Sequence, residues 1–430
     1  MSATVHTLKA SRAHLDALPE RNADDWRSTL APSKAGGFIG DERNILRAFR
    51  AAPELVGLLR YNEFALRSEF TRSPPWRTVT TGTEWTDADD TAALAWFQER
   101  EVQVRQRQIV GSVAELVAHD NTVHPVREYL NGLTWDGTAR LTTWLIEYLG
   151  AVGTAAYLEA VGRKFLISAV ARICSPGCQV DHTLVIESGQ GWKKSTALRV
   201  MAVRPEWFTD ELPDVHSKDA GMQVRAHWIV ELGELAALRR SDIEPMKAFL
   251  TRRYDDFRPP YQRRNVQTPR QCVFTGSTND QQYLRDPTGN RRFWPVRLST
   301  PLSDADLAAL EGARDQLWAE ALAAYRAGEP WHLTHDENAL AVIEQGERMM
   351  VTQLEEQTAD YIARLAIGAE VTPREIMIHA LRLDPDKSDF IERAGKLGAQ
   401  VAAAMYTHGC ERVRSVGRGI DRRNVYRRVR

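Results

Sequence analysis

The chain has 430 residues, four cysteines and a formal net charge of −1, so it is long enough for two or three domains and has no disulfide framework. No apolar run approaches the roughly 20 residues that a membrane span needs, and the N-terminus lacks the apolar segment of a secretory signal. We therefore expect a cytoplasmic protein with no membrane partner. Two segments are strongly basic: residues 247–270 carry a net charge of +5 and residues 410–430 a net charge of +6, which favours polyanionic partners.

The first third of the chain is expected to form a flexible arm and one small domain. Residues 1–37 are polar and end in APSKAGG, which predicts a flexible N-terminal arm. Apolar periodicity predicts helices over residues 41–62 and 87–103, and alternation predicts a strand over residues 74–85. We expect residues 38–150 to form one domain, helical or α+β.

Residues 151–335 alternate between helical and strand-like segments. A helix is expected over residues 155–175, and three short apolar runs follow at 183–186, 227–232 and 271–279. Each run ends in polar residues. Strands that alternate with helices favour a mostly parallel sheet, with ligands at the carboxyl ends of its strands.

The stretch ESGQGWKKST, residues 187–196, joins the first of these runs to a helical segment. It approaches the phosphate-loop pattern G-x-x-x-x-G-K-[ST], except that Ser188 and Lys193 stand at the two glycine positions. Lys194 and Ser195 occupy the positions that contact phosphate and Mg²⁺ in that pattern. Strand, loop and helix in this order predict a site for a nucleoside triphosphate and Mg²⁺.

Two polar residues at the ends of the next runs extend this site. Glu231 is the candidate carboxylate for holding Mg²⁺ or for polarising the attacking water, with Glu234 as the alternative. Asn279 is the candidate sensor of the γ-phosphate, and Thr278 is the alternative.

Phosphoryl transfer also calls for an arginine that stabilises the developing charge. The segment DPTGNRRFWPV offers Arg291 and Arg292 just before an aromatic stretch. Loop, acidic residue, sensor and arginine follow in the order expected of a nucleotide-hydrolysing core.

A third group of residues, two cysteines and a histidine, has a spacing that is sometimes found in zinc sites. Cys174, Cys178 and His182 have the spacing C-x3-C-x3-H, but the sequence offers no fourth ligand. Isolated buried cysteines are common. We do not expect a cysteine-ligated zinc ion here.

Residues 336–430 are expected to contain a helical linker and a basic domain. A helix over residues 371–381 begins with a capping box at Thr372, and Ser388 is expected to cap another helix. The arginine-rich end, residues 410–430, predicts a two-stranded ribbon. Two helices followed by a basic ribbon are typical of a winged helix, a DNA-binding fold.

The chain resembles the virulence-associated protein E family over about residues 40–335. The stretches that carry the resemblance are HPVREYLNGLTWDG, VARICSPGCQVD, ESGQGWKKST, WIVELGEL, KAFLTRRYDDFRPPY, PRQCVFTGSTN, LRDPTGNRRFWPV and RDQLWAEAL. The resemblance implies an α/β P-loop NTPase core of the AAA+-like, superfamily 3 helicase type. It also implies a DNA-dependent ATPase that assembles as a ring homo-hexamer and acts in replication of a phage, prophage or mobile element.

The family keeps the pattern Q-G-x-x-K-S-T, which places its loop residues on this chain. The residues for nucleotide binding are Gly189, Gln190, Gly191, Lys194, Ser195 and Thr196. The roles that the resemblance implies are phosphate contact for Lys194, Mg²⁺ ligation for Ser195 and Glu231, γ-phosphate sensing for Asn279, and an arginine finger acting in trans for Arg291 or Arg292.

The resemblance further implies that a basic hairpin between the acidic strand and the sensor strand contacts single-stranded DNA. The DNA-binding candidates are Lys247, Arg252, Arg253, Arg258, Arg263 and Arg264, with Tyr254 and Tyr261 able to stack on bases and Arg422 and Arg423 in the C-terminal ribbon. Many relatives carry a primase domain. Here Asp87 and Asp89 lie in a turn-like stretch without a second carboxylate strand, so we expect any primase to be a separate chain.

Three functions remain open at this point. The first is an ATP-driven helicase or translocase on single-stranded DNA. The second is a DNA-binding replication initiator or regulator that binds duplex origin DNA through the C-terminal domain and has weak or no helicase activity. The third is an NTPase switch in phage interference.

Overall fold

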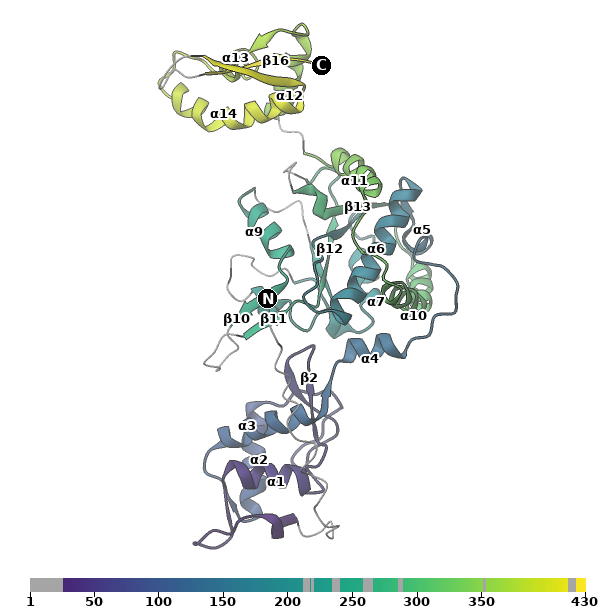
Figure 1. Cartoon of the computed structure of the whole chain (residues 1–430), viewed down its shortest axis with the longest axis vertical. Helices are drawn as coiled ribbons and strands as arrows, with labels where there is room; N and C mark the ends of the chain where they lie inside the picture. The colour runs from purple at the N-terminus through teal and green to yellow at the C-terminus, as the bar shows by residue number, and fades with distance from the viewer. Residues whose placement is uncertain are drawn as a thin grey trace.

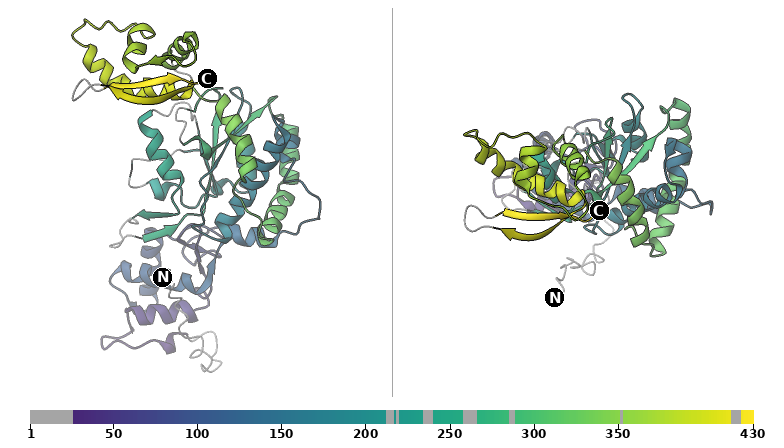
Figure 2. Two further views of the ribbon diagram at one scale, coloured as in Figure 1. Left: turned by 45° about the horizontal axis from the view of Figure 1, so that its top comes forward. Right: turned by 90° about the horizontal axis from the view of Figure 1, so that it is seen from above.

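Buried apolar residues divide the chain into three packing units, which follow one another along the molecule (Figure 1). The computed structural model describes residues 26–211, 217, 220–233, 240–257, 266–284, 289–350, 353–416 and 423–430, without the side chains of residues 240–243, 257 and 423. Figure 2 shows the same units from two further directions.

The N-terminal unit packs three helices against short strands. Its elements are η1 (Trp26–Thr29), β1 (Phe38–Ile39), α1 (Glu42–Ala51), β2 (Leu59–Asn62), β3 (Arg67–Phe70), α2 (Asp87–Glu99), β4 (Val102–Gln103), α3 (Arg107–Ala118), η2 (His119–Asn121) and β5 (Thr122–Val123). The predicted helix over 41–62 ends at Ala51, because Pro53 follows and disfavours helical backbone before it. The predicted strand over 74–85 is a loop, and the strand forms earlier, at β3.

The predicted arm is wrong for residues 26–37. The ring of Trp26 is buried and stacks on Trp96, with 5.9 Å between ring centroids. The buried side chain of Asn44 donates to Ala31 O and accepts from Ala31 N. An aromatic stack and a buried amide therefore fix this segment on the N-terminal unit, so it is not a free arm.

The central unit contains most of the helices and the largest sheet. Its helices are α4 (Pro125–Gly132), α5 (Trp144–Leu149), α6 (Ala155–Cys174), α7 (Lys194–Met201), η3 (Pro205–Trp207), α8 (Ala220–Gln223), α9 (Arg240–Leu250), η5 (Asn290–Arg292), α10 (Asp304–Arg326) and α11 (His335–Glu347). Its strands are β6 (Ala151–Val152), β7 (Thr183–Glu187), β8 (Phe208–Thr209), β9 (Ile229–Leu232), β10 (Tyr254–Phe257), β11 (Val266–Pro269), β12 (Val273–Thr278) and β13 (Phe293–Leu298).

Six strands of this unit form one sheet in the order β6-β13-β7-β12-β9-β8. The pairs from β13 to β8 are parallel, and only β6 is antiparallel to its neighbour. Leu184 and Ile186 of β7 face a core that includes α6 and α10, while Val185 faces a second core that includes α9 (Figure 1). Both faces are covered, which explains why these strands read as continuous apolar runs.

The boundary between the first two units lies near residue 124, not at residue 150 as the sequence suggested. The buried residues of α4 and α5 belong to the core of the central unit. Tyr129 Oη of α4 donates to Asp315 Oδ1 of α10 at 2.6 Å, and Arg140 N donates to Glu320 Oε2 of α10 at 2.6 Å. These helices pack on a partner 180 residues away, which local sequence patterns do not reveal.

The C-terminal unit begins at α12, later than the predicted boundary at residue 336. Helix α11 packs on the central sheet, where Gln345 Nε2 donates to Phe293 O at 2.9 Å. The unit consists of α12 (Gln353–Arg364), β14 (Glu370–Val371), α13 (Pro373–His379), α14 (Phe390–Thr407), β15 (Cys410–Val416) and β16 (Arg423–Arg428), with sheet order β14-β16-β15.

Two sequence predictions in the C-terminal unit can be compared directly with the helices. Thr372 does cap α13, since its hydroxyl accepts from Glu375 N at 3.3 Å. The predicted cap at Ser388 is displaced by one residue, because Asp389 is the residue before α14. The C-terminal ribbon forms as the antiparallel pair β15–β16, drawn in yellow in Figure 2.

Candidate functional site

Three neighbouring parallel strands bring the predicted site residues to one edge of the sheet. Strand β12 lies between β7 and β9, and Thr278 pairs with Glu187 while Thr275 pairs with Glu231. The loop after β7, the sensor candidate Asn279 after β12 and Glu231 in β9 therefore meet at the carboxyl edge. Ligands of open parallel sheets bind at this edge.

The loop from Ser188 to Lys193 turns the chain from β7 into helix α7. Gly191 has a φ of +79°, a conformation that glycine adopts at little cost. Lys193 has φ +58° and ψ +26°, so a non-glycine residue occupies the left-handed region directly before the helix. Its side chain leaves the loop, and Nζ pairs with Asp304 Oδ1 at 2.6 Å, at the start of α10.

The side chain of Lys194 is buried in the loop, with 8% exposure. Its Nζ donates to Ser188 O at 3.2 Å, to Gly189 O at 3.2 Å and to Asn279 Oδ1 at 2.8 Å. Burial lowers the pKa of the Lys194 ammonium, and the Glu231 carboxylate opposes that shift. The lysine thus links the loop to the strand that carries the sensor candidate.

Ser195 and Glu231 are in direct contact. Ser195 Oγ donates to Glu231 Oε1 at 2.8 Å. Glu231 is only 1% exposed, and its second oxygen, Oε2, is buried without a hydrogen-bond partner among the described residues. The Ser195 hydroxyl and the Glu231 carboxylate, 2.8 Å apart, are oxygen ligands of the kind that Mg²⁺ binds.

The remaining loop residues make fewer contacts. Gly189 lies under Trp192, whose Nε1 would come within 2.7 Å of a Cβ at that position. Gln190 and Thr196 are exposed beside the loop. Thr278, the alternative sensor, is buried and its hydroxyl accepts from Asp280 N at 3.1 Å, whereas Asn279 reaches Lys194. Glu234, the alternative acid, lies outside the described residues.

The arginine pair lies at the opposite edge of the same sheet. Arg291 and Arg292 directly precede β13, whose first residue, Phe293, pairs with Thr183 at the start of β7. The length of β7, about 13 Å, therefore separates the pair from the loop. Arg292 is half-buried, and its Nε is buried without a partner in the described part of the chain. Neither arginine can serve the loop of its own chain.

A buried ion-pair network at the end of β7 was missed by sequence reasoning. Glu187 is 3% exposed and accepts from Arg348 Nε at 3.0 and 3.2 Å and from Tyr283 Oη at 2.9 Å. The backbone carbonyl of Arg348 accepts from Tyr283 N and Leu284 N. This network connects the residue before the loop with the segment after Asn279. A charged residue at the end of an apolar run was the only signal in the sequence.

The basic segment 247–270 is only partly a surface. Lys247 was a DNA-binding candidate, but it is 5% exposed, lies over Gly289 and pairs with Glu244 at 2.9 Å, so it is not placed to contact a phosphate backbone. Arg270 is also buried, in a pair with Asp255. The sequence could not separate these structural cations from exposed ones.

The exposed part of this segment is the β10–β11 hairpin. Arg252 and Arg253 are exposed, and Arg253 Nε donates to Gly177 O at 2.7 Å. Tyr254 is 46% exposed. The other candidates in this hairpin, Arg258, Tyr261, Arg263 and Arg264, lie outside the described residues.

The β15–β16 ribbon presents arginines on its exposed strands. Arg412 and Arg414 are exposed on β15, and Arg414 and Arg427 both pair with Glu370, at 2.7 and 2.9 Å. Arg422 lies outside the described residues, and Arg423 is described only by its backbone. Glu370 therefore offsets part of the positive charge of the described ribbon arginines.

Cys174 and Cys178 do not converge with His182 into a candidate metal-binding group among the described residues. Cys174 and Cys178 are free thiols, and burial raises the pKa of both. His182 instead stacks on Trp294, with 3.8 Å between ring centroids. Among the described residues, no helix has the length and apolarity to cross a membrane.

The fold and the geometry of its carboxyl edge define an α/β protein with a six-stranded, mostly parallel sheet and a polar loop site between strand and helix. The chain belongs to the virulence-associated protein E-like domain family, whose model matches residues 130–350. The match includes the loop, Glu231, Asn279 and both arginines of the pair.

Comparison with solved structures finds the NrS-1 C-terminal region. Its apo structure, residues 305–718, is 10% identical in sequence and has a TM-score of 0.42. The matched region covers 86% of the present chain and 95% of the NrS-1 chain. The A form of the same region gives 10% identity, 85% and 95% coverage and a TM-score of 0.45. No curated protein matches the chain in sequence.

Proposed function

We propose that the protein is an ATP-dependent DNA helicase or translocase that acts in the replication of a phage, prophage or mobile element. The main support for this proposal is that four side chains lie together and form two hydrogen bonds at the carboxyl edge of the sheet. Lys194 donates to Asn279, and Ser195 donates to Glu231. Membership of the virulence-associated protein E-like family supports the proposal.

The residues at this edge fit ATP with Mg²⁺. The N-terminus of α7 and the loop backbone provide the positive end of a helix dipole and N–H groups for an anion. Glu231 Oε2 is a buried carboxylate oxygen without a partner in the described part of the chain, which suits a bound cation and its water shell. Ser195 Oγ and Glu231 would hold Mg²⁺, which would supply charge neutralisation on the phosphates.

The side chains of the chain then have distinct tasks. The Lys194 ammonium exchanges the loop carbonyls for phosphate oxygens and neutralises their charge. Glu231 accepts hydrogen bonds from the attacking water and orients it. Asn279 holds Lys194 before ATP binds and donates its amide to the γ-phosphate afterwards. An arginine of a neighbouring copy supplies the remaining positive charge, because Arg291 and Arg292 lie at the far edge of their own sheet.

A ring of identical subunits satisfies this requirement for a second copy. We propose a homo-hexamer in which the amino edge of one central unit faces the carboxyl edge of the next. The exposed hairpin residues Arg252, Arg253 and Tyr254 then contact the phosphates and bases of single-stranded DNA.

The experiment that tests this function compares ATP binding and ATP hydrolysis in Glu231→Gln and Asn279→Ala. Both variants are expected to bind ATP with Mg²⁺ and to lose hydrolysis by at least about 100-fold, the size of a typical acid–base or electrostatic contribution. Lys396→Ala, which removes an exposed ion pair on α14, is the control and should bind and hydrolyse ATP as the wild type does. Hydrolysis at the wild-type rate in Glu231→Gln would refute the assignment of the acid.

A second function is favoured by the C-terminal unit. Its order, α12, β14, α13, α14, β15 and β16 with a three-stranded sheet, fits the winged-helix arrangement of helices followed by a basic ribbon. This unit would bind duplex DNA at an origin, either as part of an initiator-helicase or in a regulator without helicase activity.

Duplex binding separates the two functions. A chain that ends at residue 350 is expected to keep basal ATP hydrolysis and to lose duplex binding, while Lys194→Ala is expected to keep duplex binding. Loss of duplex binding in Lys194→Ala with normal folding would contradict an independent C-terminal DNA-binding unit.

A further inference from the structure

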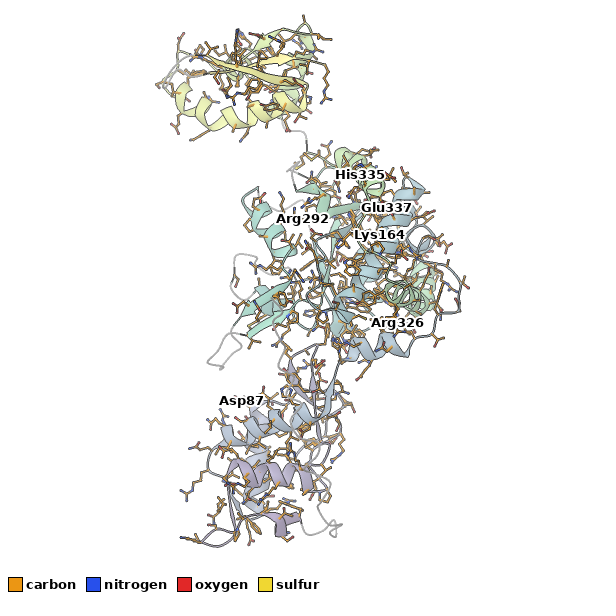
Figure 3. The ribbon with its side chains drawn as sticks, viewed as in Figure 1. Asp87, Lys164, Arg292, Arg326, His335 and Glu337 are labelled. Atoms are coloured by element: carbon orange, nitrogen blue, oxygen red, sulfur yellow. The ribbon has the colours of Figure 1, made fainter. Side chains whose placement is uncertain are left out.

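A second polar hollow lies at the amino edge of the central sheet, away from the loop site. Its volume is about 120 Å³, and the residues that line it include Asp181, His182, Trp294, His332 and the arginine pair. Figure 3 labels Arg292, together with His335 and Glu337 at the start of α11. Nothing in the proposed ATP chemistry uses Asp181, His182 or His332.

Three metal-binding side chains converge in this hollow. One ligand atom from each of Asp181, His182 and His332 lies within 4.8 Å of the others. Two of these residues directly precede β7, and the third lies in the connection between α10 and α11. One carboxylate and two imidazoles form a ligand set that zinc and related divalent transition metals accept, with a fourth position left for water.

The buried histidine is already oriented for ligation. His182 Nε2 lies 3.1 Å from Ser168 Oγ, and that hydroxyl donates to Phe165 O at 2.7 Å, so the proton between His182 and Ser168 belongs to Nε2. Nδ1 then keeps its lone pair, and it has no hydrogen-bond partner among the described residues. His182 is 4% exposed and lines the hollow. Metal-binding histidines commonly donate their other N–H in this way.

The segment that carries His332 is held beside the other two residues. Trp331 Nε1 donates to Gln179 O at 2.8 Å, and Lys164 Nζ donates to Pro330 O at 3.2 Å. The first bond fixes the α10–α11 connection against the segment before β7, and the second fixes it against α6. His332 itself is exposed and can turn, which allows the ligand atoms to approach the separation of about 3.4 Å that tetrahedral bonds of 2.0–2.1 Å require.

Arg291 and Arg292 in the lining of the hollow, and Lys164 and Arg172 near His182, oppose a cation. Lys164 is partly compensated, because its Nζ lies 3.5 Å from the Glu337 carboxylate. Arg291 is exposed, so water and salt screen its charge. Arg292 also interacts with the Glu244 carboxylate. Lys247 lowers the pKa of this carboxylate most and Arg292 lowers it further, so Glu244 balances part of the Arg292 charge. The Asp181 carboxylate offsets part of the remaining positive charge.

We propose that Asp181, His182 and His332 bind one divalent transition-metal ion of the zinc type. The ion joins the α10–α11 connection to the segment before β7 and so stabilises the amino edge at which Arg291 and Arg292 lie. The ion would contact no residue of the loop site in its own chain, since its ligands and those of the loop lie at opposite edges of the sheet.

The test uses the full-length chain, stripped of metal, and titrates it with Zn²⁺ by calorimetry and with Co²⁺ by visible absorption. We expect one ion per chain, and a visible absorption spectrum that shows the bound Co²⁺ to be four-coordinate. His332→Ala and Asp181→Asn should each weaken Zn²⁺ binding by more than about tenfold. Loss of a residue that only hydrogen-bonds a metal ligand already weakens binding by about tenfold, and these two variants remove a ligand itself. Ser168→Ala should weaken Zn²⁺ binding by about tenfold through the orientation of His182.

Two control variants make the result specific. His335→Ala removes an exposed histidine three residues from His332, and Cys174→Ser with Cys178→Ser removes the nearby thiols; neither should change Zn²⁺ affinity. The absence of stoichiometric binding, binding unaffected by His332→Ala, or binding lost with the thiols would each overturn the proposal. Stabilisation by inorganic phosphate without Zn²⁺ binding would likewise overturn it and make the hollow an anion site of the arginines.

Discussion

Lys193 stands at a position where the phosphate-loop pattern asks for glycine. The backbone here has the left-handed conformation that glycine favours. Lysine adopts it with its side chain directed away from the loop, toward Asp304. Lys193 therefore carries the energetic cost of a left-handed backbone, while its side chain stays out of the loop.

The two adjacent lysines are expected to respond in opposite ways to mutation. Lys193→Gly should retain ATP hydrolysis and change the free energy of unfolding by no more than about 1 kcal/mol, because relief of the left-handed conformation offsets the lost surface ion pair. Lys194→Ala should abolish hydrolysis. The reverse ranking in steady-state ATPase assays would show that the register of the loop is wrong by one residue.

His124 gives a prediction for pH dependence at the junction of the first two units. Its Nδ1 accepts from Arg127 N at 3.1 Å and its Nε2 lies 2.6 Å from Gln271 Oε1, so the neutral ring is the form that fits both contacts. Burial lowers the pKa of His124, and the hydrogen bond to Gln271 only partly opposes this. Below pH 6.5 the unfolded chain therefore binds a proton that the folded chain does not.

The stability of the wild type should consequently fall as the pH drops below 6.5, by up to about 1.4 kcal/mol per pH unit from this group. His124→Asn keeps a side chain that caps α4 and does not titrate. Urea unfolding at pH 5.5 and 7.5 should give a smaller pH dependence for His124→Asn than for the wild type. Equal pH dependence would contradict a neutral, buried His124.

At the scale of elements, the network around Glu187 ties the end of β7 to α11. Removal of Arg348 leaves a buried carboxylate with Tyr283 and the more distant Arg297 as its remaining partners. Arg348→Met is expected to lower the free energy of unfolding by about 3 kcal/mol. Arg393→Met, which removes an exposed pair with Asp389, should cost less than about 1 kcal/mol. Similar losses for the two variants would contradict the role of burial.

Local patterns predicted the elements of the central sheet because each carries its own signal. The run at 183–186, the helix after Lys194 and the polar ends of β9 and β12 follow from period and turn residues. The packing of α4 on α10 and the burial of Lys247 over Gly289 depend on residues far apart in the chain. Sequence periodicity contains no record of such partners, so the domain boundary and one DNA-binding candidate were wrong.

For the whole molecule, the proposed function assigns the loop and the arginine pair of one ATP site to two different copies of the chain. A mixed ring of Lys194→Ala subunits and Arg291→Ala/Arg292→Ala subunits would contain some intact ATP sites. In these sites the loop comes from the arginine variant and the arginines come from the Lys194→Ala subunit. We expect each variant alone to be inactive and the equimolar mixture to recover part of the wild-type ATPase rate. Full activity of the double arginine variant alone would contradict action in trans.

The most direct test of the central claim is the ATPase rate with and without single-stranded DNA for the wild type and Lys194→Ala, with native mass measured on the same samples. We predict hydrolysis that single-stranded DNA stimulates, a ring-sized assembly, and no hydrolysis above background in Lys194→Ala. A wild-type rate that DNA does not change, together with an unchanged rate in Lys194→Ala, would contradict the central claim.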